Sequence, residues 1–188
     1  MSAAAGSVRI IAGKWRGTRL PVAAVNGLRP SSDRVRETLF NWLQFEIQGL
    51  RVLDAFAGTG ALGFEAASRG AADVLLIESD PRACAALQAS SARLGAERVA
   101  VLQADVLSWL SAHPEQQFDL AFVDPPFAAD LHKRTLDTLL AHMRSNSWIY
   151  VEQPVADAAP KLPGWVCHRE GTTRDVRYVL FKRLGSSA

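Results

Sequence analysis

The stretch DAFAGTGALG, residues 54–63, decides the fold of this 188-residue chain. It joins a short apolar run at 51–56 to a segment of helical character at 61–69. A strand that ends in Gly-x-Gly lets the backbone turn tightly and approach a ligand without an intervening Cβ atom, and the next helix presents its N-terminal amides there. This strand–loop–helix unit predicts an α/β protein that binds a nucleotide-like cofactor at the loop.

On both sides of this loop the chain alternates between amphipathic and short apolar segments. Helices are expected at 33–47, 61–69, 81–94, 106–110 and 131–143, and buried parallel strands at 51–56, 74–78, 99–104, 118–124 and 148–152. Two further strands, 165–170 and 176–183, are separated by a loop short enough for an antiparallel pair. We therefore predict a doubly wound, seven-stranded Rossmann-like sheet with an antiparallel last strand.

The N-terminal region differs in charge from the rest of the chain. Its first 36 residues carry seven basic side chains against one acidic one, a net charge of +6, whereas the remainder carries −4. Residues 8–20, VRIIAGKWRGTRL, predict a small β-hairpin with its turn at Gly13 or Gly17. Because two strands alone are marginal in water, the hairpin must either pack on the body or become ordered only on its target. We divide the chain into a basic arm, 1–30, and a cofactor-binding domain, 31–188.

The charge of the arm predicts contact with a polyanion. Arginine outnumbers lysine 17 to 4, and its planar guanidinium suits phosphates and base edges. GC-rich coding or a solvated basic face would give the same bias, but nucleic acid is the favoured interpretation. The candidate RNA-binding residues are Arg9, Lys14, Arg16, Arg19, Arg29, Arg34 and Arg36.

Acidic residues stand at the ends of the strands that follow the glycine loop. Glu78 lies 20 residues after Gly58, where it can accept hydrogen bonds from both ribose hydroxyls, and Asp105 ends the next strand. The glycines of the loop also satisfy the dinucleotide fingerprint, so a Rossmann domain that binds NAD is the alternative. Asp54 favours S-adenosylmethionine, because its carboxylate suits the ammonium group of that cofactor better than a pyrophosphate.

A second motif, Asp124-Pro125-Pro126-Phe127, follows the fourth strand of the series. The carboxyl ends of parallel strands line the ligand crevice, so this motif is expected to face the cofactor. Asp124 can accept a hydrogen bond from the exocyclic amine of a base, and the two prolines fix the backbone and leave its carbonyls free. Phe127 offers a flat face for a flipped base, a contact of about 1 to 3 kcal/mol. A rigid turn over a core phenylalanine is the alternative, but after the glycine loop the four residues predict a catalytic site.

Together these segments resemble the class I S-adenosylmethionine-dependent methyltransferases that act on base amines. From about Val8 to Arg183 the chain looks like the RsmD family of bacterial 16S ribosomal RNA guanine-N2 methyltransferases. The specific segments are RIIAGKWRG at 9–17 and RPSSDRVRETLFN at 29–41, joined by 54–60 and 124–127. Threonine is also common in the family where Ser31 and Ser32 stand here.

The resemblance implies methyl transfer from S-adenosylmethionine to the N2 amine of a guanine in 16S ribosomal RNA, with S-adenosylhomocysteine as the product. It implies direct displacement, with Asp124 orienting the amine and Phe127 stacking the base. Ribose contacts are implied for Glu78 and adenine contacts for Asp105 and Val106. The complete cofactor set is Asp54, Phe56, Gly58, Gly60, Glu78, Asp105 and Val106. Arg29, Arg34 and Arg36 are expected either to hold RNA phosphates or to brace the cofactor loop.

Two other functions remain open from the sequence: an adenine-N6 or cytosine-N4 methyltransferase, and a non-catalytic RNA-binding assembly factor. No apolar run is long enough to span a membrane and no signal pattern is present, so we expect a cytoplasmic protein. The four histidines are dispersed and the two cysteines, Cys84 and Cys167, lie in apolar stretches, so we expect core thiols and no metal site. We expect a monomer that acts on 16S ribosomal RNA, either free or within an assembling small subunit.

Overall fold

A computed structural model describes residues 6–23, 32–126 and 131–185. The strands are β1 (Ser7–Arg9), β2 (Arg19–Pro21), β3 (Arg51–Asp54), β4 (Asp73–Glu78), β5 (Val99–Gln103), β6 (Phe118–Val123), β7 (Met143–Pro154), β8 (Trp165–Thr172) and β9 (Val176–Arg183). The helices are α1 (Asp33–Trp42), α2 (Ala61–Ser68), α3 (Pro81–Leu94), α4 (Val106–Ala112) and α5 (Leu131–Leu139), with a 3-10 turn, η1, at Leu140–His142.

The main sheet has seven strands in the order β5-β4-β3-β6-β7-β9-β8. The strands from β5 to β7 are parallel, whereas β9 pairs antiparallel with both β7 and β8. The predicted sheet with its antiparallel last strand is confirmed. Its strand order changes direction between β3 and β6, so the ends of these two strands meet at the point where ligands bind open α/β sheets.

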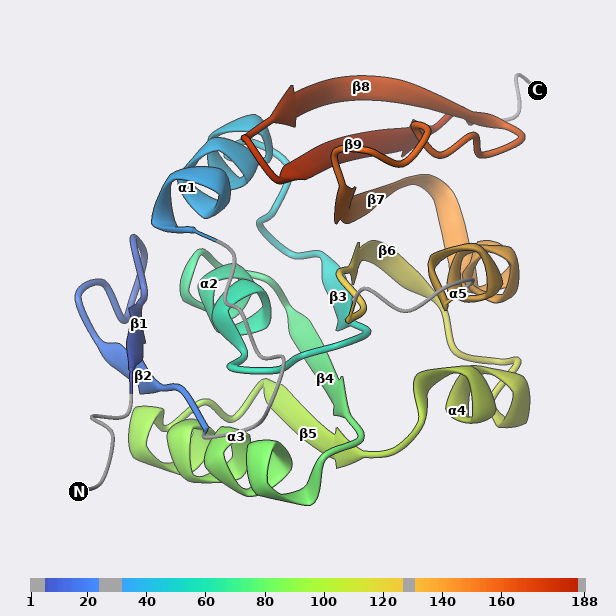
Figure 1. Ribbon diagram of the computed structural model, residues 1–188. Helices are drawn as coiled ribbons and strands as arrows, with labels where there is room; N and C mark the ends of the chain where they lie inside the picture. Colours follow the sequence, from blue (N-terminus) through green and yellow to red (C-terminus); the bar gives the residue numbers. More distant parts are fainter. Residues whose placement is uncertain (1–5, 24–31, 127–130, 186–188) are drawn as a thin grey trace.

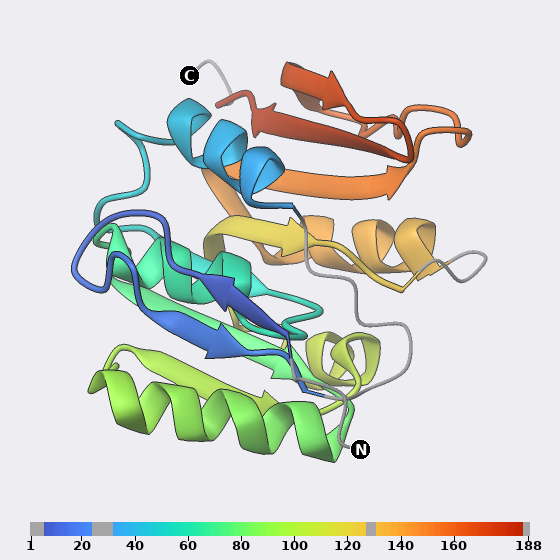
Figure 2. The same ribbon diagram turned by 60° about the vertical axis from the view of Figure 1, so that its left-hand side comes forward.

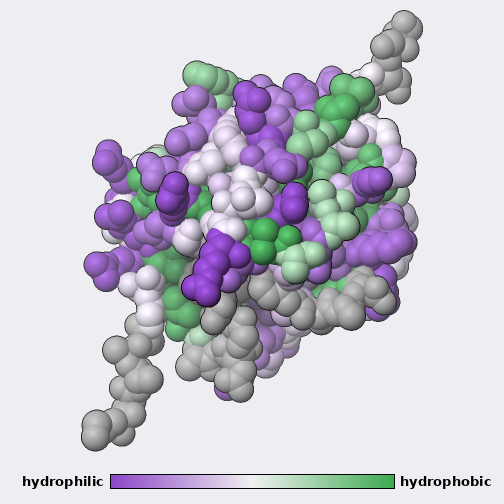
Figure 3. Space-filling view, turned by 45° about the horizontal axis from the view of Figure 1, so that its top comes forward, coloured by the Kyte–Doolittle hydropathy of each residue, from purple (hydrophilic) through white to green (hydrophobic). Residues whose placement is uncertain are grey.

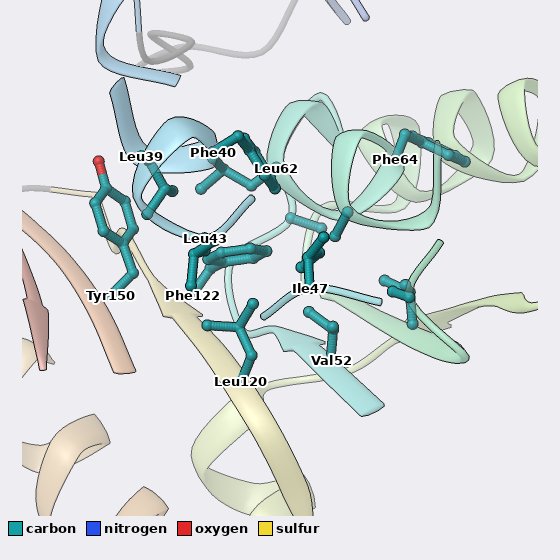
Figure 4. Packing of buried hydrophobic residues seen from close by; sticks show 14 of the residues in the cluster. Leu39, Phe40, Leu43, Ile47, Val52, Leu62, Phe64, Leu120, Phe122 and Tyr150 are labelled. Atoms are coloured by element: carbon teal, nitrogen blue, oxygen red, sulfur yellow. The ribbon is translucent and has the colours of Figure 1, made fainter. Parts of the chain in front are cut away.

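Helices cover both faces of the sheet (Figure 1). The helices α1, α2 and α3 pack on one face, and α4 and α5 on the other, which gives two buried apolar clusters. Figure 4 shows Leu39 and Phe40 of α1 beside Phe122 of β6, and the two phenylalanine rings meet edge to face with centroids 6.0 Å apart. Both faces of the central strands are therefore buried, which explains their continuous apolar composition.

Several element boundaries differ from the prediction, most of all at the ends of the first and fifth helices. The first helix ends at Trp42 and not near residue 47, because residues 43–46 form a turn that still brings Ile47 into the core. The fifth helix ends at Leu139, and the following strand runs from residue 143 to 154 in place of 148–152. In both places an apolar residue beyond the helix end is buried, so hydrophobic spacing alone could not mark where the helix stops.

The N-terminal hairpin, β1 and β2, lies against α2 and α3 (Figure 2). Ile10 and Leu20 are fully buried and belong to the same apolar cluster as α1 and α2. The carbonyl of Arg19 also accepts a hydrogen bond from Arg93 of α3 at 2.8 Å. Of the two expected states of the hairpin, the structure shows the one packed on the body.

The outer surface of the C-terminal strands carries hydrophobic groups set among hydrophilic ones (Figure 3).

Cys84 of α3 is buried as expected, but the expectation for Cys167 was wrong, because this residue lies exposed on the edge strand β8. Within the described ranges no helix is both long and apolar enough to cross a membrane.

Candidate active site at the carboxyl edge of the sheet

The glycine loop connects β3 to α2 at the carboxyl edge of the sheet. Gly60 caps α2 with a φ of 75°, and a Cβ atom there would lie 2.6 Å from the ring of Phe64 and 2.7 Å from Leu87. Gly58 also has a positive φ of 53°, and its N–H donates to Oε2 of Glu78 at 2.8 Å. Position 60 requires glycine because its φ is positive and its neighbours leave no room for a Cβ atom. The resulting turn leaves the N-terminus of α2 at this edge of the sheet.

Asp54, the last residue of β3, is buried at 3% exposure. Its Oδ2 accepts a hydrogen bond from the N–H of Gly63 in α2 at 3.0 Å. Burial raises the pKa of Asp54 to about 7, the hydrogen bond from Gly63 opposes that rise, and the charge of Glu78 adds to it. A carboxyl group with this pKa can change its charge near neutral pH when a cation binds beside it.

Two further acids, Glu78 at the end of β4 and Asp105 just after β5, are held in place by backbone N–H groups. Glu78 accepts hydrogen bonds from the N–H of Gly58 and, through Oε1, from the N–H of Asp80, both at 2.8 Å. Asp105 is the N-cap of α4 and accepts from the N–H of Ser108 at 2.9 Å, and the hydrogen bonds from Ser108 lower its pKa. The ends of β3, β4 and β5 thus bring Asp54, Glu78 and Asp105 to one edge, in the arrangement expected for a nucleoside and its amino-acid group.

The Asp-Pro-Pro motif directly follows β6, whose last strand residue is Val123. Asp124 is partly exposed, Pro125 is buried and Pro126 is exposed. Since β6 pairs with β3, Asp124 lies one strand away from Asp54 along the sheet edge. Phe127, the fourth predicted catalytic residue, lies outside the described residues.

A buried tyrosine–glutamate pair on the neighbouring strand was not predicted from the sequence. The hydroxyl of Tyr150 donates to Oε1 of Glu152 at 2.8 Å, and both residues belong to β7. Tyr150 is fully buried and Glu152 is 4% exposed. Two residues that are two positions apart on a strand lie on the same face, and this spacing was the available signal for the pair. The position of the pair beside the Asp-Pro-Pro motif depends on the strand register, which the sequence does not show.

The structure gives Arg36 a different environment from that of the other basic candidates. Its side chain is fully buried, its Nη2 donates to the carbonyl of Arg9 at 2.8 Å and to Asp33 at 2.7 Å, and its Nη1 lies 3.8 Å from Glu65. The guanidinium therefore joins α1 to the hairpin. A buried guanidinium is not placed for contact with RNA phosphates, and these partners lie in the hairpin, α1 and α2 and not in the cofactor loop.

Glu65 of α2 binds the backbone of the hairpin, and this role was not predicted from the sequence. This fully buried carboxylate accepts hydrogen bonds from the N–H groups of Ile11 at 2.6 Å and Ala12 at 3.0 Å, and from Nε of Arg69 at 2.7 Å. Ser68 bonds the hairpin turn as well, through the N–H groups of Lys14 and Trp15. An acid inside an apolar helix was the available signal, but its hairpin partners are more than fifty residues away in the sequence.

The remaining basic candidates of the described chain are exposed. Those on the hairpin lie along its outer side, and Arg34 lies in the first turn of α1. Arg29 falls outside the described residues. The exposed candidates are Arg9, Lys14, Arg16, Arg19 and Arg34. We call these five exposed side chains the basic surface; four of them belong to the hairpin, whose backbone is hydrogen-bonded to α2.

This arrangement can bind a cationic nucleoside cofactor and present an amine acceptor to it. Backbone amides and acids surround the start of α2, and Asp124 supplies a hydrogen-bond acceptor on the adjacent strand. Among the residues that the structure describes, no group of three or more His, Cys, Asp or Glu could hold a metal ion.

Comparisons with known proteins agree with this geometry. A family model described as "Conserved hypothetical protein 95" matches residues 8–182. Ribosomal RNA small subunit methyltransferase D of Escherichia coli (strain K12) is 43% identical over 185 residues, which cover 95% of this chain and 91% of that protein. The protein of the same name from Haemophilus influenzae is 40% identical and covers 95% of each chain.

Solved structures show the same architecture. The methyltransferase YhhF from Escherichia coli matches with a TM-score of 0.86 and 42% identity, covering 96% of this chain and 100% of that one. A 16S ribosomal RNA N2 methyltransferase of T. thermophilus, in complex with AdoMet and guanosine, shares the fold with a TM-score of 0.70 at 21% identity, covering 95% of this chain and 50% of that one. The resemblance seen in the sequence is confirmed: the chain belongs to the Conserved hypothetical protein 95 family, the family of the small-subunit ribosomal RNA methyltransferases D.

Proposed function

We propose that this protein transfers a methyl group from S-adenosylmethionine to the exocyclic N2 amine of a guanine in 16S ribosomal RNA. The observation that carries the proposal is the placement of Asp124-Pro125-Pro126 at the end of β6, one strand from the glycine loop. The names of the relatives, ribosomal RNA small subunit methyltransferases, support the substrate class. The enzyme would act as a monomer in the cytoplasm, without a metal, on free RNA or an assembling subunit.

The cofactor would be held by the acids and amides of the first three strand ends. S-adenosylmethionine supplies an electrophilic methyl group when bound. Asp54 would face its ammonium group, and Glu78 would accept from the ribose hydroxyls. Phe56 and the amides at Gly58 and Gly60 would line the same site, while the side chain of Asp105 and the N–H of Val106 would contact the adenine.

The target base would enter from the Asp-Pro-Pro side. The amine of a nucleobase is a poor nucleophile because its lone pair is delocalised into the ring, so catalysis depends on positioning. The carboxylate of Asp124 would accept one N–H, and a carbonyl of the proline turn would accept the other. Phe127 would stack on the flipped base. Such an arrangement aims the lone pair at the methyl group and needs no covalent enzyme intermediate.

The basic surface would hold the RNA backbone. Its exposed members are Arg9, Lys14, Arg16, Arg19 and Arg34, and Arg29 is proposed with them. Phosphate contacts of this kind fix the orientation of an RNA without reading its sequence. We propose the basic arm, 1–30, as the RNA-binding part of the molecule and residues 31–188 as the methyltransferase domain.

Label transfer tests the proposal. The purified protein is incubated with S-adenosylmethionine labelled in the methyl group and with either naked 16S ribosomal RNA or small ribosomal subunits from cells that lack the gene. We expect label in RNA, and the more efficient substrate identifies the natural one. No label in either substrate, with cofactor binding intact, would instead support a non-catalytic RNA-binding factor. Binding of NAD in place of S-adenosylmethionine would overturn the assignment of the cofactor.

A further inference from the structure

Two acidic residues stand side by side at the carboxyl edge, Asp124 after β6 and Glu152 near the end of β7. The strands are parallel, and Val123 pairs with Val151, so Asp124 and Glu152 are the next pair along the edge. Neighbouring strands lie about 4.8 Å apart. This spacing suits two acceptors that serve adjacent donors on one flat ligand.

The position of Glu152 is fixed from several directions. Its Oε1 accepts the hydroxyl of Tyr150, whose ring packs edge to face against Phe122 with centroids 6.2 Å apart. Figure 4 shows Tyr150 at the margin of the apolar cluster, beside Leu39. The carbonyl of Glu152 lies 2.6 Å from Nε2 of His132 in α5. A carboxylate that is 4% exposed and bound in this way is more deeply buried than the partly exposed Asp124.

Asp124 and Glu152 both affect the pKa of the Tyr150 hydroxyl. Burial raises the pKa of Tyr150, and the charges of Glu152 and Asp124 raise it further. The strand register places both carboxylates near the end of the tyrosine side chain. The base side of the site is therefore rich in hydrogen-bond acceptors, and Pro125 and Pro126 add no N–H donor to it.

Such a surface distinguishes between the three bases that carry an exocyclic amine. In guanine the ring nitrogen next to the amine, N1, carries a hydrogen and donates. In adenine and cytosine the corresponding ring nitrogen has a lone pair and accepts. A carboxylate beside this position attracts the first base and repels the other two, since each of those would leave two acceptors facing each other.

We propose that Glu152 determines the specificity for guanine by accepting the N1–H of the target base while Asp124 accepts from the neighbouring N2 amine. This inference rests on the proposed function and identifies the group that reads the base. Tyr150 is its positioning residue, because it holds the Glu152 carboxylate without touching the substrate.

The test compares two RNAs that differ at the target nucleotide. The methylated guanine is first mapped in the wild-type reaction, and a synthetic RNA is then made with 2-aminopurine at that position. 2-Aminopurine keeps the N2 amine, but its N1 has a lone pair and no hydrogen. Values of kcat/KM are measured for both RNAs with the wild-type protein, Glu152→Gln and Glu152→Asp. The control is Glu170→Gln, the same chemical change at an exposed position of β8.

The wild-type protein should prefer guanine by about 100-fold or more, because a missing hydrogen-bond partner in a polar site is strongly rejected. Glu152→Gln should reduce this preference at least tenfold, since its amide can donate to N1 of 2-aminopurine. Glu152→Asp and Glu170→Gln should keep the preference, even if Glu152→Asp is slower. Melting temperature and binding of S-adenosylmethionine show whether each variant is folded.

Three outcomes would overturn the inference. Equal use of both RNAs by the wild-type protein would show that N1 is not read, and this measurement needs no variant. A folded Glu152→Gln protein that loses activity equally on both RNAs would make Glu152 structural. Loss of the preference in Glu152→Asp, which keeps the charge, would assign it to packing. If the wild-type protein methylates neither RNA and no ribosomal RNA, the proposed function itself fails.

Discussion

Asp54 is deeply buried, and we propose that its carboxylate faces the ammonium group of the cofactor. Its raised pKa, about 7, means that the free protein carries a protonated Asp54 below neutral pH. A cation favours the ionised form, so binding of S-adenosylmethionine should release a proton from this group. We expect the affinity to increase as the pH rises from 5.5 to 7, by up to about tenfold per pH unit.

Isothermal titration calorimetry in two buffers of different ionisation enthalpy measures this proton release directly. In Asp54→Asn the binding should be weaker and should lose both the pH dependence and the proton release in this range. Cofactor binding by the wild-type protein that stays constant between pH 5.5 and 7 would show that Asp54 does not face the ammonium group.

Asp124 is expected to act on the rate and not on cofactor binding. Asp124→Ala removes the carboxylate that orients the amine, and we expect the methylation rate to fall at least ~100-fold, as for other positioned polar groups. Calorimetry should show S-adenosylmethionine binding unchanged. Near wild-type turnover in this variant would mean that the backbone carbonyls orient the amine alone.

Motif residues were predictable from the sequence because each belongs to a local strand-to-loop unit. Asp54, Glu78, Asp105 and Asp124 all stand at the strand ends that the alternating pattern predicted. Glu152 and Glu65 were missed for a physical reason. Their importance comes from strand register and from contacts distant in the sequence, neither of which hydrophobic periodicity encodes.

At the scale of elements, the hairpin depends on the close approach of its turn to α2. Gly13 has a φ of 79°, and a Cβ atom there would lie 1.9 Å from the carbonyl oxygen of Ser68. At Gly17, which has a φ of 84°, a Cβ atom would meet no described residue within 4 Å apart from the chain neighbours of Gly17. The two glycines share a backbone conformation, but only Gly13 is packed against a neighbouring helix.

Substitution of each glycine by alanine separates these two effects. Gly17→Ala should cost about 1 to 2 kcal/mol of unfolding free energy, the penalty for a left-handed conformation. Gly13→Ala should cost at least about 2 kcal/mol more, because the hairpin must move off α2 to relieve the overlap. Urea unfolding measures both values. Equal losses would show that hairpin docking contributes little to stability.

The hairpin was predicted as an element, but its role in the core was not. Ile10 and Leu20 complete an apolar cluster, and Glu65 satisfies two of the hairpin N–H groups. Deleting residues 1–20 would expose this cluster and leave the Glu65 carboxylate and the Arg36 guanidinium without these partners. Such a deletion should therefore lower the melting temperature. Because a less stable protein would confuse a test of RNA binding, neutralising the exposed charges is a better test than deleting the hairpin.

At the scale of the whole molecule, the basic surface should control the salt dependence of RNA binding. Neutralising Arg9, Lys14, Arg16 and Arg19 removes exposed charges and no buried contact of the side chains. Each phosphate contact contributes about 0.7 to 0.9 to the slope of log affinity against log salt concentration. We expect weaker binding and a slope smaller by up to about 3.6.

Filter binding at three salt concentrations, with a thermal melt of the same protein, checks this expectation. The melting temperature should change little, because the four side chains are exposed. An unchanged affinity and slope would identify the hairpin charges as a solvated surface and would leave the hairpin with a structural role only.

The seven-stranded, doubly wound sheet with its antiparallel last strand follows from the alternating sequence, and the family assignment agrees with it. What the sequence could not show is the placement of the hairpin on α2. This contact joins the basic surface to the helix that begins at the cofactor loop. The helix α2 thus contacts both the hairpin, which we propose binds RNA, and the glycine loop, which we propose binds the cofactor.

The identity of the methylated nucleoside tests the central claim most directly. 16S ribosomal RNA from cells that lack the gene is incubated with the protein and S-adenosylmethionine, digested to nucleosides and analysed by mass spectrometry, with Asp124→Ala as the inactive control. The account predicts N2-methylguanosine, formed by the wild-type protein and reduced at least ~100-fold in the variant. N6-methyladenosine or N4-methylcytidine as the product would contradict it.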